Sequence, residues 1–414
     1  MSGQPASLWR HGDFLKLWSA QTVSGFGARA AREGLPMTAV LLLKAPPQAM
    51  GALAALGLAA YGLGGLVAGG LADRLPRRAL LISADLGRAL VMLVVPAIAI
   101  WGHLTLAELG LALALMSGLT VIFDVADHAY LPSVVARAQL VDGNAKLAAT
   151  DSIAEVGGPA IAGLLFQWLT APIAVAVSAL TYVASALLLL AIPSRPDVAD
   201  SEAAPAEPAS LHPLAGLRIV WANPVVRPIW LMAVAGDFFG WFFGALYLIY
   251  ALDVLKLSTT LLGLTIAAGG VGGLVGAAVA PIATRRLGAG RAAVTGAFLG
   301  GLAAFLIPLA PASPLMAMGF LVAAQLVGDG LRTMTEIGLS SLRQTLIAGP
   351  ELGRAGGAFA AGRGLTGVAG ALLGGALGAS LGPRETLLIA AAGMTAVAVL
   401  GRLSPLWRAQ TPAV

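Results

Sequence analysis

Residues Gly69-Gly-Leu-Ala-Asp-Arg-Leu-Pro-Arg-Arg78 carry the chain from one long apolar run, residues 49–72, into a second, residues 79–101. Each run reaches the roughly 20 residues that an α-helix needs to cross the hydrocarbon core of a bilayer. The charged residues between the runs are too few for a folded domain, and proline supports a tight turn. The stretch therefore predicts two membrane-spanning helices joined by a short basic loop.

The composition of the whole chain is that of an integral membrane protein. Of its 414 residues, 58% are hydrophobic and only 11% are charged, whereas soluble domains carry about 25% charge. The chain has no cysteine, and its four histidines form no His-Glu-x-x-His pair. Disulfides, thiol chemistry and the common zinc sites are therefore excluded. No P-loop supports ATP hydrolysis, so a gradient must supply any energy, and no cofactor is expected.

Apolar runs of spanning length can be counted along the chain, and they predict twelve transmembrane helices. They cover residues 15–43, 49–72, 79–101, 104–129, 147–168, 171–192, 225–252, 260–284, 292–310, 314–339, 357–381 and 386–403. The predicted fold class is an all-α membrane protein.

A polar linker divides the predicted spans into two sets of six. Residues 1–192 are expected to form an N-terminal six-helix bundle, and residues 225–414 a C-terminal one. The linker, residues 193–224, begins with a stretch rich in proline, alanine and acidic residues, which cannot form a core. Residues 211–221 within it are expected to form a short amphipathic helix on the membrane surface.

The basic residues favour one orientation in the membrane. Placed on alternate sides, most of the 25 lysines and arginines fall on the side of the N-terminus, with Lys44, Lys256 and Arg384 on the other. By the positive-inside rule, both termini are cytoplasmic and the protein is expected in the inner (plasma) membrane. No basic block is longer than Arg77 and Arg78, so nucleic acid is not an expected partner.

The two halves of the chain resemble each other. One constant shift in residue number places Trp18 on Trp230, Asp124 on Glu336 and Leu140 on Leu352. The same shift places residues 158–163 on residues 370–375, and both stretches are rich in glycine. A shift that stays constant across several spans indicates a duplicated, pseudo-symmetric architecture.

The loop between the second and third spans resembles a signature of the major facilitator superfamily. Residues 69–78 match the pattern G-x-L-x-D-R-x-G-R-R, with Pro76 in place of the usual glycine. The equivalent loop of the second half, residues 283–291, has lost the acid. Residues 130–145 and 341–354 resemble the group of that superfamily that contains macrolide and enterobactin exporters. The resemblance implies two bundles of six helices around a central cavity.

The resemblance also implies two functional elements. A conformational latch would be formed by the loop residues Gly69, Asp73, Arg74, Arg77 and Arg78. The Asp73 carboxylate would lie against a helix N-terminus of the other half, and the arginines would hold anionic lipid headgroups. The alternative is that the arginines only set the orientation. In the fifth span, Gly158, Pro159 and Gly163 resemble the G-P-x-x-G-G element of proton-coupled antiporters, with Ala162 in place of a glycine.

Ionisable side chains inside the spans are candidates for function, because each costs about 2.5 to 3.5 kcal/mol to insert without a partner. In the first span, Arg29 and Glu33 lie four residues apart and are expected to neutralise each other, which leaves Arg32 without that partner. Asp85 and Arg88 in the third span are expected to form a structural pair.

Asp124 in the fourth span and Glu336 in the tenth are the leading candidates for proton or substrate sites, because they correspond under the shift. A carboxylate that alternates between an apolar environment and an arginine can take up and release a proton, and Arg32 or Arg332 could be that arginine. A permanent ion pair is the alternative for each carboxylate. The acids nearer the span ends are expected to be solvated: Asp127, Asp151, Glu155 and Asp329.

The seventh span contains a run of aromatic residues that follows Asp237. A cationic substrate would gain from the carboxylate and from the ring faces, by about 0.5 to 2 kcal/mol per contact. Asp237 and Trp241 are therefore candidate substrate residues. The alternative is that the rings face lipid or neighbouring helices.

These features predict a monomeric secondary transporter that exports hydrophobic small molecules, cationic ones among them, in exchange for protons by alternating access. Its partners would be the small-molecule substrate, protons and anionic membrane lipids. The alternative within the same fold is a lysophospholipid flippase or another facilitator of lipids or metabolites. A sensor or membrane enzyme is disfavoured because the sequence contains no convincing catalytic set.

Overall fold

The computed structural model describes residues 7–72, 74–193 and 213–409, and nearly all of them are helical. The chain divides into two compact units. One comprises Met1–Ala45 and Leu56–Ala204, and the other comprises Pro46–Ala55 and Pro205–Val414. The short segment Pro46–Ala55, at the start of the second long helix, belongs to the second unit, which the sequence did not indicate.

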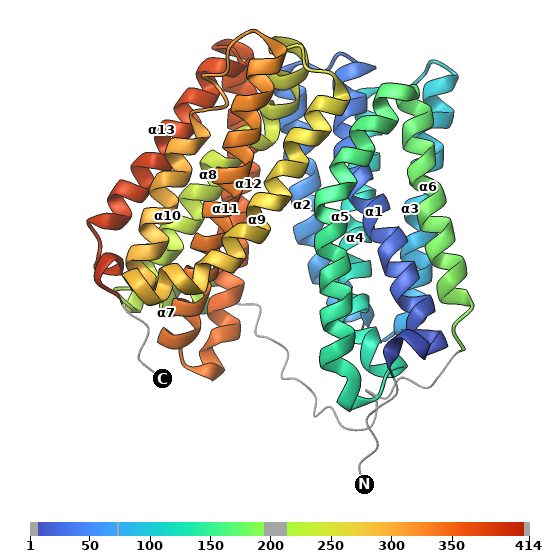
Figure 1. Cartoon of the computed structure of the whole chain (residues 1–414), viewed down its shortest axis with the longest axis horizontal. Helices are drawn as coiled ribbons and strands as arrows, with labels where there is room; N and C mark the ends of the chain where they lie inside the picture. The colour runs from blue at the N-terminus through green and yellow to red at the C-terminus, as the bar shows by residue number, and fades with distance from the viewer. Residues whose placement is uncertain (1–6, 73, 194–212, 410–414) are drawn as a thin grey trace. The chain divides into compact units, whose positions relative to one another are not determined.

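The first unit is built from long helices that pack side by side (Figure 1). They are α1 (Gly12–Leu41), α2 (Pro47–Ala72) from Leu56 onward, α3 (Arg77–Ile100), α4 (Leu106–Val134), α5 (Leu140–Trp168) and α6 (Ala171–Leu190). Helix α1 packs against α5 and α6, and α3 packs against α4 and α6. Proline near the start of α6 and a capping box of Thr105 and Glu108 before α4 fix where these helices begin.

The second unit repeats this scheme. It contains α7 (Pro213–Ala222), α8 (Val226–Ile249), α9 (Thr259–Leu287), α10 (Ala289–Ala304), α11 (Pro314–Leu346), α12 (Gly349–Ser380) and α13 (Pro383–Arg402), followed by a 3₁₀ helix, Pro405–Arg408. Helix α8 packs against α12 and α13, and α10 packs against α11 and α13. These pairs correspond to those of α1 and α3 in the first unit.

Side-chain packing supports the duplication at the shift that the sequence predicts. Trp9 and Trp18 meet edge to face with ring centroids 5.3 Å apart, and Trp221 and Trp230 do so at 5.6 Å. The Trp18 indole N–H donates to Thr150 of α5, and the Trp230 indole N–H donates to a backbone carbonyl of α12. In each unit the first long helix is therefore tied to the fifth by an equivalent tryptophan.

The buried cores and the close helix contacts follow the same shift. Leu8, Phe14 and Leu17 lie in the core of the first unit, and Val220, Val226 and Ile229 occupy the shifted positions in the second. Helix α2 approaches α4 so closely that a methyl group on Gly64 would touch Gly118, and the shifted residues Gly276 and Gly330 show the same close approach between α9 and α11. Glycine at these positions lets the helices pack closely.

The number of membrane crossings is supported in part. Every predicted span overlaps one of the long helices. Among the described residues, eight helical segments are long and apolar enough to cross a membrane, and they lie in α2, α3, α4, α6, α8, α9, α11 and α13. Helix α10 has 16 residues, α1 carries charged residues along its length, and α12 carries them in its first half. That all twelve cross the bilayer stays a prediction.

Several helices are longer than their apolar runs. Helix α5 begins at Leu140 instead of residue 147, α11 ends at Leu346 instead of residue 339, and α12 begins at Gly349 instead of residue 357. These extra turns are polar, so a count of apolar residues does not include them. The backbone hydrogen bonds of a helix continue beyond the point at which its side chains stop being apolar.

The predicted amphipathic helix is present as α7, while residues 194–212 of the linker lie outside the described residues. Val220 is fully buried, and Leu217 and Ile219 pack against the core of the second unit. Helix α7 contacts α12 and α8, and Gly216 lies directly against the backbone of Arg354. Much of its apolar side is thus covered by protein, whereas the sequence predicted contact with the membrane surface.

Candidate functional site

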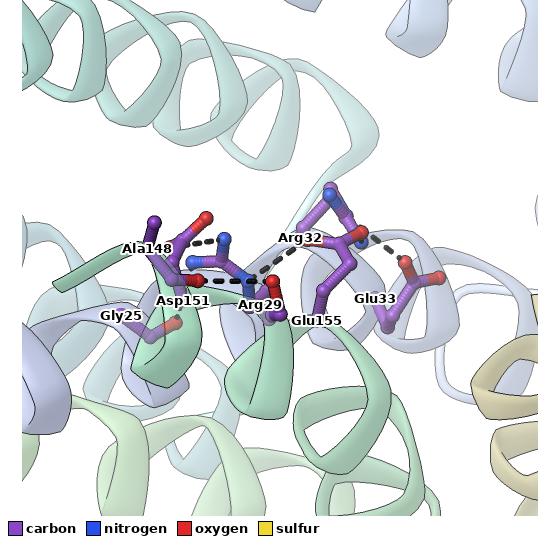
Figure 2. A network of polar contacts seen from close by, with 8 residues as sticks. Gly25, Arg29, Arg32, Glu33, Ala148, Asp151 and Glu155 are labelled. Atoms are coloured by element: carbon purple, nitrogen blue, oxygen red, sulfur yellow. Dashed lines mark hydrogen bonds and ion pairs between the residues drawn. The ribbon is translucent and has the colours of Figure 1, made fainter. Parts of the chain in front are cut away.

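Five charged side chains of α1 and α5 form a continuous chain in the first unit (Figure 2). Arg29 donates to Asp151 at 2.6 Å and to Glu155 at 2.9 Å. Arg32 donates to the other oxygen of Glu155 at 2.7 Å and to Glu33 at 3.3 Å. The order Asp151, Arg29, Glu155, Arg32, Glu33 alternates negative and positive charges. We call these five residues the N-unit charge chain.

This arrangement corrects two sequence-based expectations. The salt bridges of Arg29 run to Asp151 and Glu155 on α5, and no salt bridge joins it to Glu33, four residues along its own helix. Asp151 and Glu155 form salt bridges to arginine while their side chains stay 63% and 41% exposed, so the sequence missed their partners and not their exposure. Arg32, expected to be left without Glu33, is the arginine that pairs with Glu33, and it also pairs with Glu155. The spacing rule identifies partners on one helix and does not reveal the opposite helix.

The glycine motif of α5 explains how the helices approach. Gly158, Pro159 and Gly163 are all buried. A methyl group on Gly158 would collide with the Cβ of Arg29. The absence of a side chain there lets Arg29 lie close to α5 and reach its two carboxylates.

The second unit contains a matching chain of five charges. Arg332 donates to Asp329 at 3.2 Å and to Glu336 at 3.4 Å within α11. Arg363 of α12 donates to Glu336 at 3.2 Å and to Asp237 of α8 at 2.6 Å. The order Asp329, Arg332, Glu336, Arg363, Asp237 again alternates in sign. We call these residues the C-unit charge chain.

Arg363 is a member that the sequence analysis missed. It stands alone in the long glycine-rich run of the eleventh span, and a lone guanidinium at that depth needs an acidic partner. That signal was available in the sequence. Arg332, one of the two arginines named as a possible partner of a carboxylate, forms a salt bridge to Glu336.

Two of the aromatic residues of α8 pack against neighbouring helices. Phe239 lies on Gly393 of α13, and Phe242 lies on Gly374 of α12. Phe242 is fully buried, so these two rings fill helix interfaces, as the alternative interpretation expected. Trp241 is half-buried and its ring lies over Gly244 of the same helix. Asp237, in contrast, belongs to the C-unit charge chain.

Asp124 and its shifted equivalent Glu336 lie in different local environments. Asp124 on α4 accepts a hydrogen bond at 3.3 Å from the hydroxyl of Tyr61, which lies on α2. Glu336 has two arginine partners. The duplication therefore preserves an acid at this position while the partner groups differ.

Asp85 and Arg88 form the pair expected of them, deep inside the first unit. Their closest atoms are 2.5 Å apart, and the side chains are 0% and 1% exposed. Ser24 of α1 donates to Asp85 at 3.1 Å. The guanidinium lies 4.2 Å from the ring centroid of Phe123 and 4.7 Å from that of Tyr182. This pair joins α3 to its neighbours in the core.

The predicted latch is described only in part. Asp73 lies outside the described residues. Arg77 donates to the carbonyl of Ala129 at 3.0 Å. Arg78 donates to the carbonyls of Leu189 and Leu190 at 2.9 and 2.8 Å. Both arginines thus bind carbonyls near the C-terminal ends of helices, where the helix dipole favours cations. Gly69 is exposed, and so is Arg74.

The family model of the Major Facilitator Superfamily matches residues 17–335. The chain belongs to the Major Facilitator Superfamily. Its membership indicates a multi-pass membrane protein of the transporter class, with a small molecule as substrate. No curated protein matches the chain.

Solved structures of several transporters share the fold over nearly the whole chain. The nucleoside transporter NupG (D323A mutant) has 14% identity and a TM-score of 0.75, over 95% of this chain and 99% of that one. A bacterial homolog of the human lysosomal transporter Spinster, inward-facing and unoccupied, has 13% identity and a TM-score of 0.74, over 99% and 100%. A bacterial homologue of the iron transporter ferroportin, inward-facing, has 19% identity and a TM-score of 0.65, over 98% and 100%. At such identities the likeness shows the fold alone.

Proposed function

We propose that the chain is a secondary active transporter that exports hydrophobic small molecules, including cationic ones, in exchange for protons by alternating access. Membership of the superfamily supports the transporter class. The observation that carries the finer proposal is the charge balance of the two charge chains. Each contains three carboxylates and two guanidinium groups.

The charge balance leaves one negative charge in each charge chain when all five of its groups are ionised. An uncompensated charge inside a membrane protein is costly, so each charge chain favours the uptake of one positive charge. A proton on a carboxylate or the cationic group of a substrate would meet this need equally. Two ligands that neutralise the same charge exclude each other, and this competition is the basis of exchange.

Two carboxylates are the strongest candidates for carrying the proton within the charge chains. Glu33 is 15% exposed, and its salt bridge to Arg32 is the longest of its chain, at 3.3 Å. Glu336 has two arginine contacts, both longer than 3 Å. Their ionised forms are held less firmly than that of Glu155, which has contacts of 2.7 and 2.9 Å. Asp124, hydrogen-bonded to Tyr61, is a third candidate.

The other parts of the proposal concern conformation and location. The loop with Gly69, Asp73, Arg74, Arg77 and Arg78 would act as a conformational latch. We place the protein as a monomer in the inner (plasma) membrane with both termini in the cytoplasm, following the distribution of lysine and arginine. Anionic lipids and protons are its further partners in this proposal.

Transport into inverted membrane vesicles tests the proposal. We expect uptake of a labelled lipophilic cation, tetraphenylphosphonium, to rise several-fold when an inside-acid pH gradient is imposed and to fall when a protonophore is added. Equal uptake with and without the gradient in vesicles that contain folded protein would contradict proton exchange.

Site variants then locate the proton carrier. Glu33→Gln, Asp124→Asn and Glu336→Gln should each impair gradient-driven uptake while the protein stays folded. Glu351→Gln is the matched control, because Glu351 is an exposed acid in the first turn of α12 and belongs to neither charge chain. Wild-type uptake in all three site variants would remove these carboxylates from the mechanism.

A lipid facilitator is the second candidate. The close glycine contacts of α9 with α11, at Gly272 and Gly276, form a seam of small residues that could part towards the bilayer. Movement of labelled lysophospholipid that is independent of the pH gradient, with no movement of the lipophilic cation, would favour this function.

A further inference from the structure

The end of the described chain folds back onto the start of α10 in the second unit. The backbone N–H of Gly290 donates to the carbonyl of Ala409 at 3.1 Å. Leu406 in the 3₁₀ helix is fully buried, and its carbonyl lies directly against Gly290. Figure 1 shows the end of α13 beside the turn that joins α9 to α10. Two segments distant in sequence, the turn between α9 and α10 and the chain after α13, therefore meet at one end of this unit.

Arginines are concentrated at this meeting point. Arg285 and Arg286 lie in the last turn of α9, Arg402 in the last turn of α13, and Arg408 in the 3₁₀ helix. With Arg291 in the first turn of α10, they form what we call the arginine patch. All five are exposed. Within the described part of the chain, none of the five side chains makes a hydrogen bond or an ion pair.

One indole organises the centre of the patch. The guanidinium groups of Arg402 and Arg291 lie 5.1 and 5.9 Å from the ring centroid of Trp407. Two cations are thus held near one half-buried ring. Their mutual repulsion is not offset by any carboxylate within salt-bridge distance in the described residues. The patch has the charge of a site that lacks its anion.

The equivalent loop of the first unit, residues 69–78, differs from the turn between α9 and α10 in its charges and its contacts. The shift that relates the two halves places Arg285 on Asp73, so the second copy has a base where the first has an acid. In the first copy, Arg77 and Arg78 bind backbone carbonyls. The arginines of the second copy have no such partners in the described residues. The orientation of the protein in the membrane does not by itself require two distant segments to bring arginines to one tryptophan.

Apolar side chains border the patch and indicate the kind of anion. Leu287 follows Arg286 and is 49% exposed, Leu403 follows Arg402 and is 78% exposed, and Leu400 is 66% exposed. A free phosphate or a nucleic acid gains nothing from exposed leucines. A phospholipid uses both, because its phosphate accepts hydrogen bonds from guanidinium groups and its acyl chains cover apolar side chains. Tryptophan is also favoured at the level of the headgroups.

We propose that the arginine patch binds the headgroup of an anionic phospholipid, with Arg291, Arg402 and Arg408 around its phosphate and the leucines of α13 against its acyl chains. This site is separate from both charge chains and does not depend on the substrate of transport. Its chemistry is that of a diacyl phosphate ester with a net negative charge.

Native mass spectrometry of the full chain in a neutral detergent tests the site. Phosphatidylglycerol and phosphatidylcholine are added in turn, and the apparent Kd of the first bound lipid is measured. Near an anionic surface each arginine contributes about a factor of five in affinity, so Arg291→Gln with Arg402→Gln should weaken binding of phosphatidylglycerol about 30-fold. Binding of phosphatidylcholine should change little.

The matched control is Arg10→Gln with Arg218→Gln, which removes two exposed arginines elsewhere. It should leave the affinity for phosphatidylglycerol within about twofold of wild type. Trp407→Ala, which keeps every charge, should weaken binding because the two guanidinium groups lose their common ring. Unfolding midpoints in phosphatidylcholine nanodiscs check that each variant is folded.

Several outcomes would overturn the proposal. One is an affinity for phosphatidylglycerol that is unchanged by Arg291→Gln with Arg402→Gln. Another is an equal loss of that affinity in the control variant, which would indicate attraction by the total charge only. Displacement of the lipid by millimolar inorganic phosphate would assign the site to free phosphate instead of a lipid.

Discussion

The buried pair of Asp85 and Arg88 allows a stability prediction whose size follows from the structure. Both side chains are excluded from solvent, and Arg88 is also covered by the rings of Phe123 and Tyr182. Arg88→Met keeps a long apolar stem but leaves the Asp85 carboxylate ionised without its partner. Breaking a buried pair in this way costs about 3 to 5 kcal/mol. Ser24, which donates to the same carboxylate, cannot replace a full charge.

The cost converts into a measurable change in unfolding temperature. For a unit of this size each kcal/mol lowers the midpoint by about 2 to 4 °C, so Arg88→Met should unfold roughly 6 to 20 °C below wild type. The assay is thermal unfolding of purified protein in detergent, followed by far-ultraviolet circular dichroism.

The double variant Asp85→Leu with Arg88→Met gives the decisive control. Replacing both members of a buried pair with apolar residues is close to neutral, so the double variant should lie within about 1 kcal/mol of wild type. It should also transport normally, since the pair is assigned to the core. The reasoning is refuted if Arg88→Met matches wild type, or if the double variant is as unstable as the single one. A stable double variant without transport would refute the purely structural role.

Three further predictions concern the helix contacts. Gly158→Ala should push Arg29 away from α5, which should destabilise the protein by about 1 to 3 kcal/mol in thermal unfolding and lower vesicle uptake. The control Gly62→Ala, at a position with open space, should change neither the stability nor the uptake. Arg363→Gln should abolish most gradient-driven uptake but cost only about 1 kcal/mol of stability, because the side chain is 41% exposed, and Arg363→Lys should restore part of the uptake. Trp230→Phe removes an indole N–H that donates at 3.1 Å to α12, and should cost about 1 kcal/mol in thermal unfolding.

The fold could be predicted because membrane spans appear in the sequence as apolar runs, and the duplication appears as a constant shift in residue number. Apolar runs located each long helix, and the shift that aligns Trp18 with Trp230 also aligns their ring contacts in space. Helix ends were less accurate where a helix continues as polar turns, as α5 does at Leu140. Those turns contain no apolar signal.

The site was harder to predict because its contacts join different helices. Spacing within α1 suggested that Arg29 pairs with Glu33, whereas the structure gives Arg29 two carboxylates on α5. Their separation in the sequence is more than a hundred residues, and no local rule contains it. A lone charge in an apolar run remains informative. The lone charge of Arg363 in its apolar run indicates that an acidic partner exists, but it does not identify that partner as Asp237.

The two charge chains together show which feature the duplication retained. The shift between the halves places Asp151 on Arg363, and both lie on the fifth long helix of their unit. In the first unit this helix supplies acids to Arg29 of α1; in the second it supplies the cation to Asp237 of α8. The sign at each end is reversed, yet the bridge between the first and fifth helices is present in both. Coulomb attraction between two helices is unchanged when both charges are exchanged. We therefore propose that the bridge holds the first and fifth long helices of each unit together, and that the excess carboxylate of each charge chain is the group that takes up a proton or a cation.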